Sequence, residues 1–157
     1  MEIIKATMAD LEDIVKLRVD CMTMIMGEMP AEKKEGIETQ MRDYVSRALP
    51  EGNFTAFLAK ANEPNGSFIC SCAFMVMNER PASPSFLTGV TATVVNVMTY
   101  PEYRRRGLAA KVMDAVIAEA KRLNVTMLEL AATHEGSKLY ETLGFQYPGY
   151  KLMRMYL

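Results

Sequence analysis

Hydrophobic residues recur along the chain with two different periods, and each period predicts one kind of element. In three segments they recur every three or four residues, which is the spacing of an amphipathic helix. These segments are residues 11–25, 37–48 and 108–123. Between and around them lie runs rich in β-branched and aromatic residues, which are typical of strands. These runs are residues 2–6, 54–61, 67–77, 90–99, 126–130 and 147–157.

Turn and capping residues separate the predicted elements. Residues 7–10 have the spacing of a capping box before the first helix, and residues 62–66 end in Asn-Gly, a hairpin-turn pair. Residues 78–89 contain two prolines and predict a long loop. Thr133 can cap a last short helix, which ends at Gly144. The predicted order, β-α-α-β-β-β-α-β-α-β, indicates an α/β protein with a mixed sheet.

Size and charge narrow the function classes. A chain of 157 residues and 17.6 kDa is expected to form one domain, residues 1–157. Its net charge of −1 gives no general attraction to nucleic acid or anionic lipid, so neither is an expected partner. No apolar run approaches the roughly 20 residues of a membrane span, and residues 1–4 lack a signal-peptide pattern. We therefore expect a cytoplasmic protein without membrane contact.

The three cysteines do not indicate a metal site. Cys21, Cys70 and Cys72 are odd in number and lack a CxxC spacing, so buried, reduced thiols are expected. Cys70 and Cys72, two residues apart in a predicted strand, are expected on one face of the sheet.

The chemistry is concentrated where a strand runs into a helix. Pro101 ends the strand, residues 104–106 are three arginines, and Gly107 precedes the most regular helix of the chain. The first N–H groups of a helix have no internal partner and carry a partial positive charge. Gly107 and the small Ala109 allow close approach of a ligand to the backbone. The turn is therefore a candidate anion-binding site.

Two motifs resemble those of the GNAT superfamily of acyl-CoA-dependent N-acetyltransferases. Residues 104–109, RRRGLA, resemble its diphosphate-binding motif, Gln/Arg-x-x-Gly-x-Gly/Ala, and residues 139–145, LYETLGF, resemble the signature before its last hairpin. The resemblance is close over residues 96–145. It implies an α/β fold with a mixed, mostly antiparallel sheet, a splayed central parallel strand pair, about four flanking helices and a closing strand at residues 147–157.

The resemblance also implies acetyl-CoA as cosubstrate, with no metal. The pantetheine arm would lie along the strand at residues 97–99, and the diphosphate would rest on the amides of residues 105–110. Thr133 stands where the family frequently has an asparagine. The residues expected to bind acetyl-CoA are Val97, Met98, Thr99, Arg104, Arg105, Arg106, Gly107, Leu108, Ala109, Ala110 and Thr133.

The resemblance assigns Tyr140 to protonation of the departing thiolate. A phenol with a pKa of about 10 is a suitable donor to a thiolate whose acid form has a pKa near 8.5. The base is harder to find, because residues 90–99 contain no Asp or Glu. His134, the only histidine, is a candidate. An exposed histidine at the start of a helix is the alternative interpretation.

These features predict transfer of an acetyl group from acetyl-CoA to a primary amine of a small molecule or peptide. A non-enzymatic acyl-CoA-binding module of the same fold is the alternative. The acceptor depends on the shape of residues 22–36 and 78–89, and the Met-rich residues 22–29 are expected to link the first two helices. The sequence leaves open whether the chain is a monomer or a homodimer.

Overall fold

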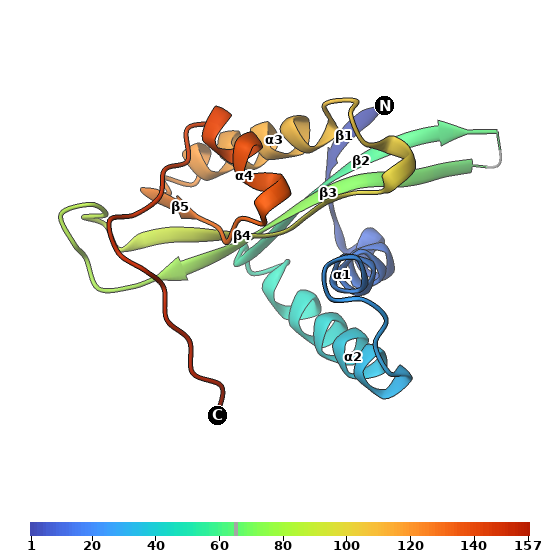
Figure 1. Ribbon diagram of the computed structural model, residues 1–157, viewed down its shortest axis with the longest axis horizontal. Helices are drawn as coiled ribbons and strands as arrows, with labels where there is room; N and C mark the ends of the chain where they lie inside the picture. Colours follow the sequence, from blue (N-terminus) through green and yellow to red (C-terminus); the bar gives the residue numbers. More distant parts are fainter. Residues whose placement is uncertain (65) are drawn as a thin grey trace.

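One five-stranded sheet organises the computed structural model, which describes residues 1–64 and 66–157 (Figure 1). The strands are β1 Glu2–Lys5, β2 Phe54–Glu63, β3 Gly66–Glu79, β4 Val90–Thr99 and β5 Met127–Glu129. They follow sequence order across the sheet, with β1 to β4 antiparallel and β5 parallel to β4. This arrangement confirms the predicted mixed α/β fold. Asn65, part of the predicted hairpin turn, lies outside the described residues.

The helices cover the sheet on both sides: α1 and α2 lie on one face, and α3 and α4 on the other (Figure 1). Their bounds are α1 Leu11–Met26, α2 Ala31–Ala48, α3 Leu108–Arg122 and α4 His134–Thr142, with short 3₁₀ turns η1 Met8–Asp10 and η2 Pro101–Tyr103. The predicted capping box is present, because Thr7 and Asp10 bond each other's backbone through their side chains at η1, just before α1. In the described part of the chain, no helix has both the length and the apolar character that crossing a membrane requires.

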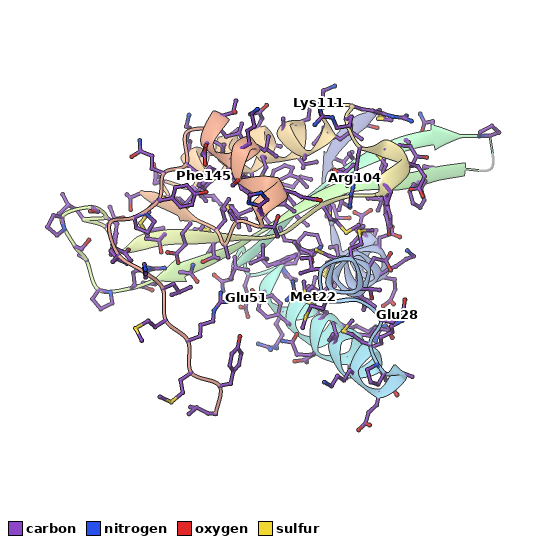
Figure 2. The ribbon with its side chains drawn as sticks, in the orientation of Figure 1. Met22, Glu28, Glu51, Arg104, Lys111 and Phe145 are labelled. Carbon is purple, nitrogen blue, oxygen red and sulfur yellow. The ribbon has the colours of Figure 1, made fainter. Side chains whose placement is uncertain are left out.

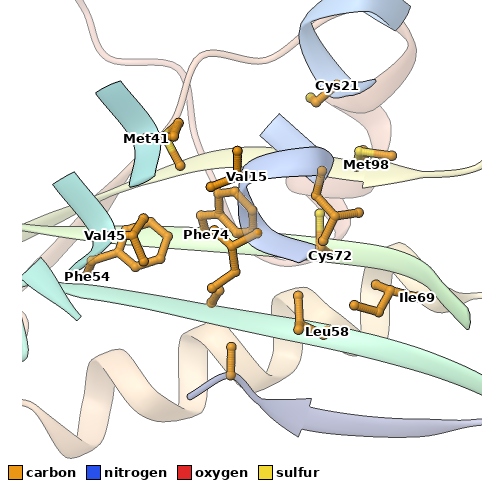
Figure 3. Packing of buried hydrophobic residues seen from close by; sticks show 14 of the residues in the cluster. Val15, Cys21, Met41, Val45, Phe54, Leu58, Ile69, Cys72, Phe74 and Met98 are labelled. Atoms are coloured by element: carbon orange, nitrogen blue, oxygen red, sulfur yellow. The ribbon is translucent and has the colours of Figure 1, made fainter. Parts of the chain in front are cut away.

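Each face of the sheet has its own hydrophobic core. On the side of α1 and α2, Phe54 packs edge-on against Phe74, with ring centroids 5.4 Å apart, and Val15 and Val45 close the cluster (Figure 3). On the other side, the apolar stripe of α3 lies on β2, β3 and β4. Its buried residues are Leu108, Val112, Met113, Val116 and Ala120. The period of residues 108–123 therefore predicted this contact correctly.

Two β-bulges interrupt the alternation of side chains in the central strands. One adds a residue to β3 near Cys70, where the pairing with β2 shifts between Ala59 and Lys60. As a result Cys70 lies in the core under α3 and Cys72 in the core under α1. The prediction that the two cysteines share a face is wrong, because the extra residue changes the side to which the following side chains point.

The second bulge lies in β4. Val95 pairs with Phe74 and Met98 with Cys72, so Asn96 and Val97 together oppose one residue of β3. Asn96 has φ 57°, a left-handed conformation that Asn adopts more readily than most residues. After the bulge, Val97 faces the α3 side and Met98 the α1 side. The pairing of β4 with β5 has already ended at Thr93 and Glu129, so the two parallel strands separate at their carboxyl ends.

Several predicted boundaries were wrong, and one predicted strand is missing. Residues 147–157 form no strand and are exposed along their whole length, because no neighbouring strand in the described chain pairs with them. The second helix begins at Ala31 rather than at residue 37, since charged residues in its first turns hide the helical period. β3 continues to Glu79, which shortens the predicted loop. Most of the Met-rich residues 22–29 belong to α1, which extends to Met26.

Candidate active site

The turn between β4 and α3 presents a row of free backbone donors. The amide N–H groups of residues 105–110 donate no hydrogen bond to any described residue; the bonds resume with Lys111 N–H to Gly107 C=O, 3.1 Å. Arg105 and Gly107 have φ of 62° and 73°. Left-handed residues alternating with ordinary ones turn successive N–H groups toward one side, which makes an anion-binding concavity. The turn can therefore hold a diphosphate through its main chain.

The arginine side chains of this turn are partly engaged with the turn itself. Arg104 Nε donates to Thr99 C=O at 3.2 Å, and Arg106 donates to Glu102 C=O at 2.9 Å while its guanidinium lies 5.1 Å from the centre of the Tyr103 ring. In Figure 2, Arg104 and Lys111 lie on the side of the molecule where α3 begins, away from Met22 of α1. The turn thus combines local positive charge with free amides.

A cavity of about 830 Å³ extends from this turn past the carboxyl end of β4 to the start of α4. It contacts every residue expected to bind acetyl-CoA except Arg106, and also both predicted catalytic residues. The predicted residues that line it are Val97, Met98, Thr99, Arg104, Arg105, Gly107, Leu108, Ala109, Ala110, Thr133, His134 and Tyr140. The structure therefore brings together residues from β4, α3 and α4 at the place where ligands bind in open α/β sheets.

The first turn of α4 fixes the position of the Tyr140 ring, which packs closely against the backbone at Gly136. Thr133 Oγ1 accepts the Gly136 N–H at 3.2 Å, so this hydroxyl caps the helix. A Cβ on Gly136 would lie 2.9 Å from Cε2 of Tyr140, so only glycine leaves the ring in place. Phe145 packs edge-on against the same ring, with centroids 6.0 Å apart. Burial raises the pKa of Tyr140, so its phenol carries a proton at neutral pH.

The far wall of the cavity belongs to α1 rather than to a linker between the first two helices. Cys21, Met24 and Ile25 of this helix line the cavity opposite α4. Met24 and Ile25 fall within residues 22–36, on which the acceptor was expected to depend. No local motif signals the contact of Cys21, which lies more than 60 positions before β4 in the chain. The wall is mostly apolar and lies on the side of the sheet opposite α3 and α4.

Two sets of hydrogen bonds fix α1 against β4. Asn96 Nδ2 donates to Leu17 C=O at 3.2 Å, and Arg18 donates to Asn96 Oδ1 at 3.3 Å. Further along, the Tyr100 hydroxyl donates to Asp20. Burial, reinforced by this bond, raises the pKa of Tyr100 to about 12. The bulge residue Asn96 therefore both redirects β4 and positions the helix that walls the cavity.

The titratable groups along the cavity are few. His134 and Glu135, at the start of α4, are exposed and line it together with Tyr140. β4 places no carboxylate in the cavity, because residues 90–99 contain no Asp or Glu. Among the described residues, no group of three or more His, Cys, Asp or Glu side chains is placed to hold a metal ion.

Comparison with known proteins identifies the family. The model of the acetyltransferase (GNAT) domain matches residues 54–147, more than half of the chain. A solved structure with the same fold is a protein from Clostridium acetobutylicum, described as a predicted acetyltransferase and crystallised with acetyl-CoA. It is 24% identical with a TM-score of 0.82, over 98% of this chain and 95% of that one. No curated protein matches the sequence significantly.

Two further structures share the fold at lower identity. A GCN5-related N-acetyltransferase from Ralstonia eutropha JMP134 is 21% identical with a TM-score of 0.81, over 98% of this chain and 97% of that one. Glucosamine-6-phosphate N-acetyltransferase from Arabidopsis thaliana is 13% identical with a TM-score of 0.69, over 99% of this chain and 97% of that one. With the turn, the splayed strands and the family match together, the chain belongs to the GNAT superfamily of acetyltransferases.

Proposed function

We propose that the 157-residue chain acts as one domain that transfers an acetyl group from acetyl-CoA to a primary amine. The observation that carries this proposal is the row of six free amides at residues 105–110, which opens into a cavity bordered by Tyr140. The amides and the start of α3 would bind the diphosphate of acetyl-CoA. The crystallisation of the Clostridium protein with acetyl-CoA supports this choice of cosubstrate.

The separated ends of β4 and β5 fit the rest of the cosubstrate. Beyond Thr93, β4 has no partner on the β5 side in the described chain, so an extended chain with amide groups can lie there. Val97, Met98 and Thr99 line this part of the cavity. A pantetheine arm in this position would lead from the turn at Gly107 toward Tyr140 and α1.

The reaction then needs a neutral amine and a protonated leaving group. An alkylamine with a pKa near 10.4 is mostly protonated at pH 7, and its deprotonation to the nucleophilic form costs about 4–5 kcal/mol. His134, Glu135 or water at the cavity mouth would accept this proton. The amine nitrogen attacks the thioester carbonyl carbon, the carbon–sulfur bond breaks, and the Tyr140 hydroxyl gives its proton to the thiolate. The acetylated nitrogen then loses its extra proton, which restores the Tyr140 phenol through water. The raised pKa of Tyr140 keeps that proton available.

A small-molecule or peptide amine is the proposed acceptor. It would enter between α1 and α4, where Cys21 and Met24 face His134 and Tyr140 across the cavity. The Arabidopsis neighbour, named for a small phosphorylated amino sugar, supports a small-molecule acceptor. We propose a cytoplasmic location on the grounds of composition and reduced cysteines.

The test is release of free thiol from acetyl-CoA in the presence of amines, amino acids and peptides. Acetyl transfer predicts amine-dependent thiol release that saturates with acetyl-CoA. The alternative, a non-enzymatic acyl-CoA-binding module, predicts acetyl-CoA binding without thiol release for any amine. Binding of neither acetyl-CoA nor CoA would contradict both.

Tyr140→Phe separates a chemical role of the hydroxyl from packing. This variant keeps the ring against Phe145 and removes the proton donor, so kcat is expected to fall by about 10²-fold or more with little change in acetyl-CoA affinity. Tyr44→Phe in α2, whose ring packs on Phe54 far from the cavity, is the matched control and should leave kcat unchanged. Equal kcat for wild type and Tyr140→Phe would remove the hydroxyl from the mechanism.

A further inference from the structure

A second hollow, the α1–α2 groove, has a volume of about 450 Å³ and lies between these two helices. The helices pack against each other on one face of the sheet, and Met22 projects from α1 toward α2 (Figure 1, Figure 2). Most of the lining is apolar and flexible. Its apolar side chains are Met22, Met26, Met29, Ile37 and Met41. A hollow of this size, with an apolar lining and a few polar groups, is typical of a small-molecule site.

Two cations line the same groove, and no acidic side chain of the described residues does. Arg18 is partly buried, and its one hydrogen bond within residues 1–64 and 66–157 is to Asn96 Oδ1, 3.3 Å. Neither Arg18 nor Lys33, the second cation, forms a salt bridge with any carboxylate of the described chain. A guanidinium has five N–H donors and stays charged, so most donors of Arg18 are open to a ligand. The groove therefore favours an anionic group.

Arg18 also lies next to the candidate active site. Its partner Asn96 is the bulge residue of β4, and the following residue, Val97, lines the cavity. Burial raises the pKa of the Cys21 thiol and the charge of Arg18 lowers it, so the guanidinium acts on a second residue of the cavity wall. Neighbouring turns of α1 line both hollows. The groove and the cavity therefore approach each other at Arg18.

We propose that the acceptor of the acetyl group is an amine that also carries a carboxylate and an apolar side chain, with the size of a single apolar amino acid. This inference rests on the proposed acetyl transfer and names the class of its acceptor. The carboxylate would lie on Arg18, with Lys33 adding positive charge, and the apolar side chain would lie among the methionines of the groove. The amine would point past Asn96 into the cavity, toward the thioester and Tyr140.

The chemistry of the groove favours this class over other amines. The planar guanidinium matches the two oxygens of a carboxylate, and such charge-assisted pairs are stronger than neutral hydrogen bonds. Methionine adapts to side chains of different shape, so several apolar amino acids should fit. A polyamine without a carboxylate would meet Arg18 and Lys33 with like charge, which is unfavourable. Because these contacts lie away from the reacting atoms, they should act on the acceptor KM and leave kcat nearly unchanged.

The test compares leucine with leucinamide, which has the same apolar group but no carboxylate. The kcat/KM of thiol release from acetyl-CoA should be at least about tenfold higher for leucine, mainly through a lower KM. Serine, which keeps the carboxylate and lacks the apolar group, should also be at least about tenfold poorer than leucine. Equal values for leucine and leucinamide would overturn this inference and leave acetyl transfer intact. Thiol release with no amine at all would contradict acetyl transfer, and this inference with it.

Variants of the two cations test whether the groove is the source of the preference. Arg18→Gln should bring the leucine-to-leucinamide ratio of kcat/KM close to one by raising the KM for leucine, and Arg18→Lys should restore part of it. Lys33→Gln should lower the ratio by roughly two- to fivefold, since Lys33 is more exposed than Arg18. Lys121→Gln, exposed on α3, is the matched control and should keep the wild-type ratio.

Acetyl-CoA binding, which does not involve the groove, reports whether each variant is folded. Arg18→Gln also loses the bond to Asn96, whereas Lys33 bonds no described residue, so Lys33→Gln tests the groove without disturbing β4. A wild-type ratio in folded Arg18→Gln would overturn the inference. If Arg18→Gln does not fold, a wild-type ratio in Lys33→Gln would overturn it.

Discussion

Replacement of Asn96 is the most specific test of the bulge in β4 and of the contact with α1 that together shape the cavity. Asn96→Ala removes the hydrogen bonds to Leu17 C=O and from Arg18, each contributing about 0.5–1.5 kcal/mol, and a longer, weaker one to Cys72 Sγ at 3.6 Å. Alanine at φ 57° adds a left-handed backbone penalty of roughly 1–2 kcal/mol. The expected loss in the free energy of unfolding is therefore about 2–5 kcal/mol.

Asn96→Gly separates the two contributions. Glycine loses the same hydrogen bonds but adopts positive φ without penalty, at an entropic cost of roughly 0.5–1 kcal/mol. The glycine variant should therefore be more stable than the alanine variant by about 0.5–1 kcal/mol, although glycine normally weakens a strand. Urea denaturation followed by circular dichroism measures all three proteins. An alanine variant as stable as the glycine variant would show that Asn96 is not left-handed and that the described bulge is wrong.

Two further predictions concern an ion pair and a glycine. Hydrogen bonds from Arg122 lower the pKa of Glu119 to about 2, so its stabilisation is present above its ordinary pKa of 4.5 and is lost as the pH falls through about 2. Glu119→Gln should lower the free energy of unfolding by about 1–3 kcal/mol at pH 7. The difference in free energy between variant and wild type should shrink as the pH falls from about 5 to about 2. A difference that stays constant over this range would contradict the pairing. Gly136→Ala should displace the ring of Tyr140 and lower kcat by about tenfold or more, and an unchanged kcat would refute the contact. The control is Gly36→Ala in exposed α2, where an added Cβ has no atom within 4 Å. It should raise the free energy of unfolding by about 0.5–1 kcal/mol without changing kcat.

Local signals explain which parts of the fold and site were predictable. The end of β4, the turn and α3 could be predicted because their conformations depend on residues that are adjacent in the sequence. The signals are the apolar period of residues 108–123 and the proline, arginines and glycine before it. The same is true of the cap at Thr133 and of Gly144, with φ 96°. The turn at Gly107 could therefore be placed correctly from the sequence.

Features set by pairing between distant strands were not predictable in this way. The bulges at Cys70 and Asn96 depend on how β2, β3 and β4 align, and alternation within one strand carries no sign of an extra residue. The contact of Cys21 with the cavity depends on the docking of α1 through Asn96 and Tyr100. Residues 147–157 have the composition of a strand, but no strand of the described chain pairs with them.

Calorimetric titration with acetyl-CoA is the most direct test of the central claim, that main-chain amides at residues 105–110 hold a diphosphate and direct a thioester toward Tyr140. We expect one saturable site per chain, and S-acetylpantetheine, which lacks the diphosphate, should bind at least about tenfold more weakly, a difference of about 1.4 kcal/mol. Folded protein that gives no saturable heat with acetyl-CoA, or that binds the two compounds equally, would contradict the account.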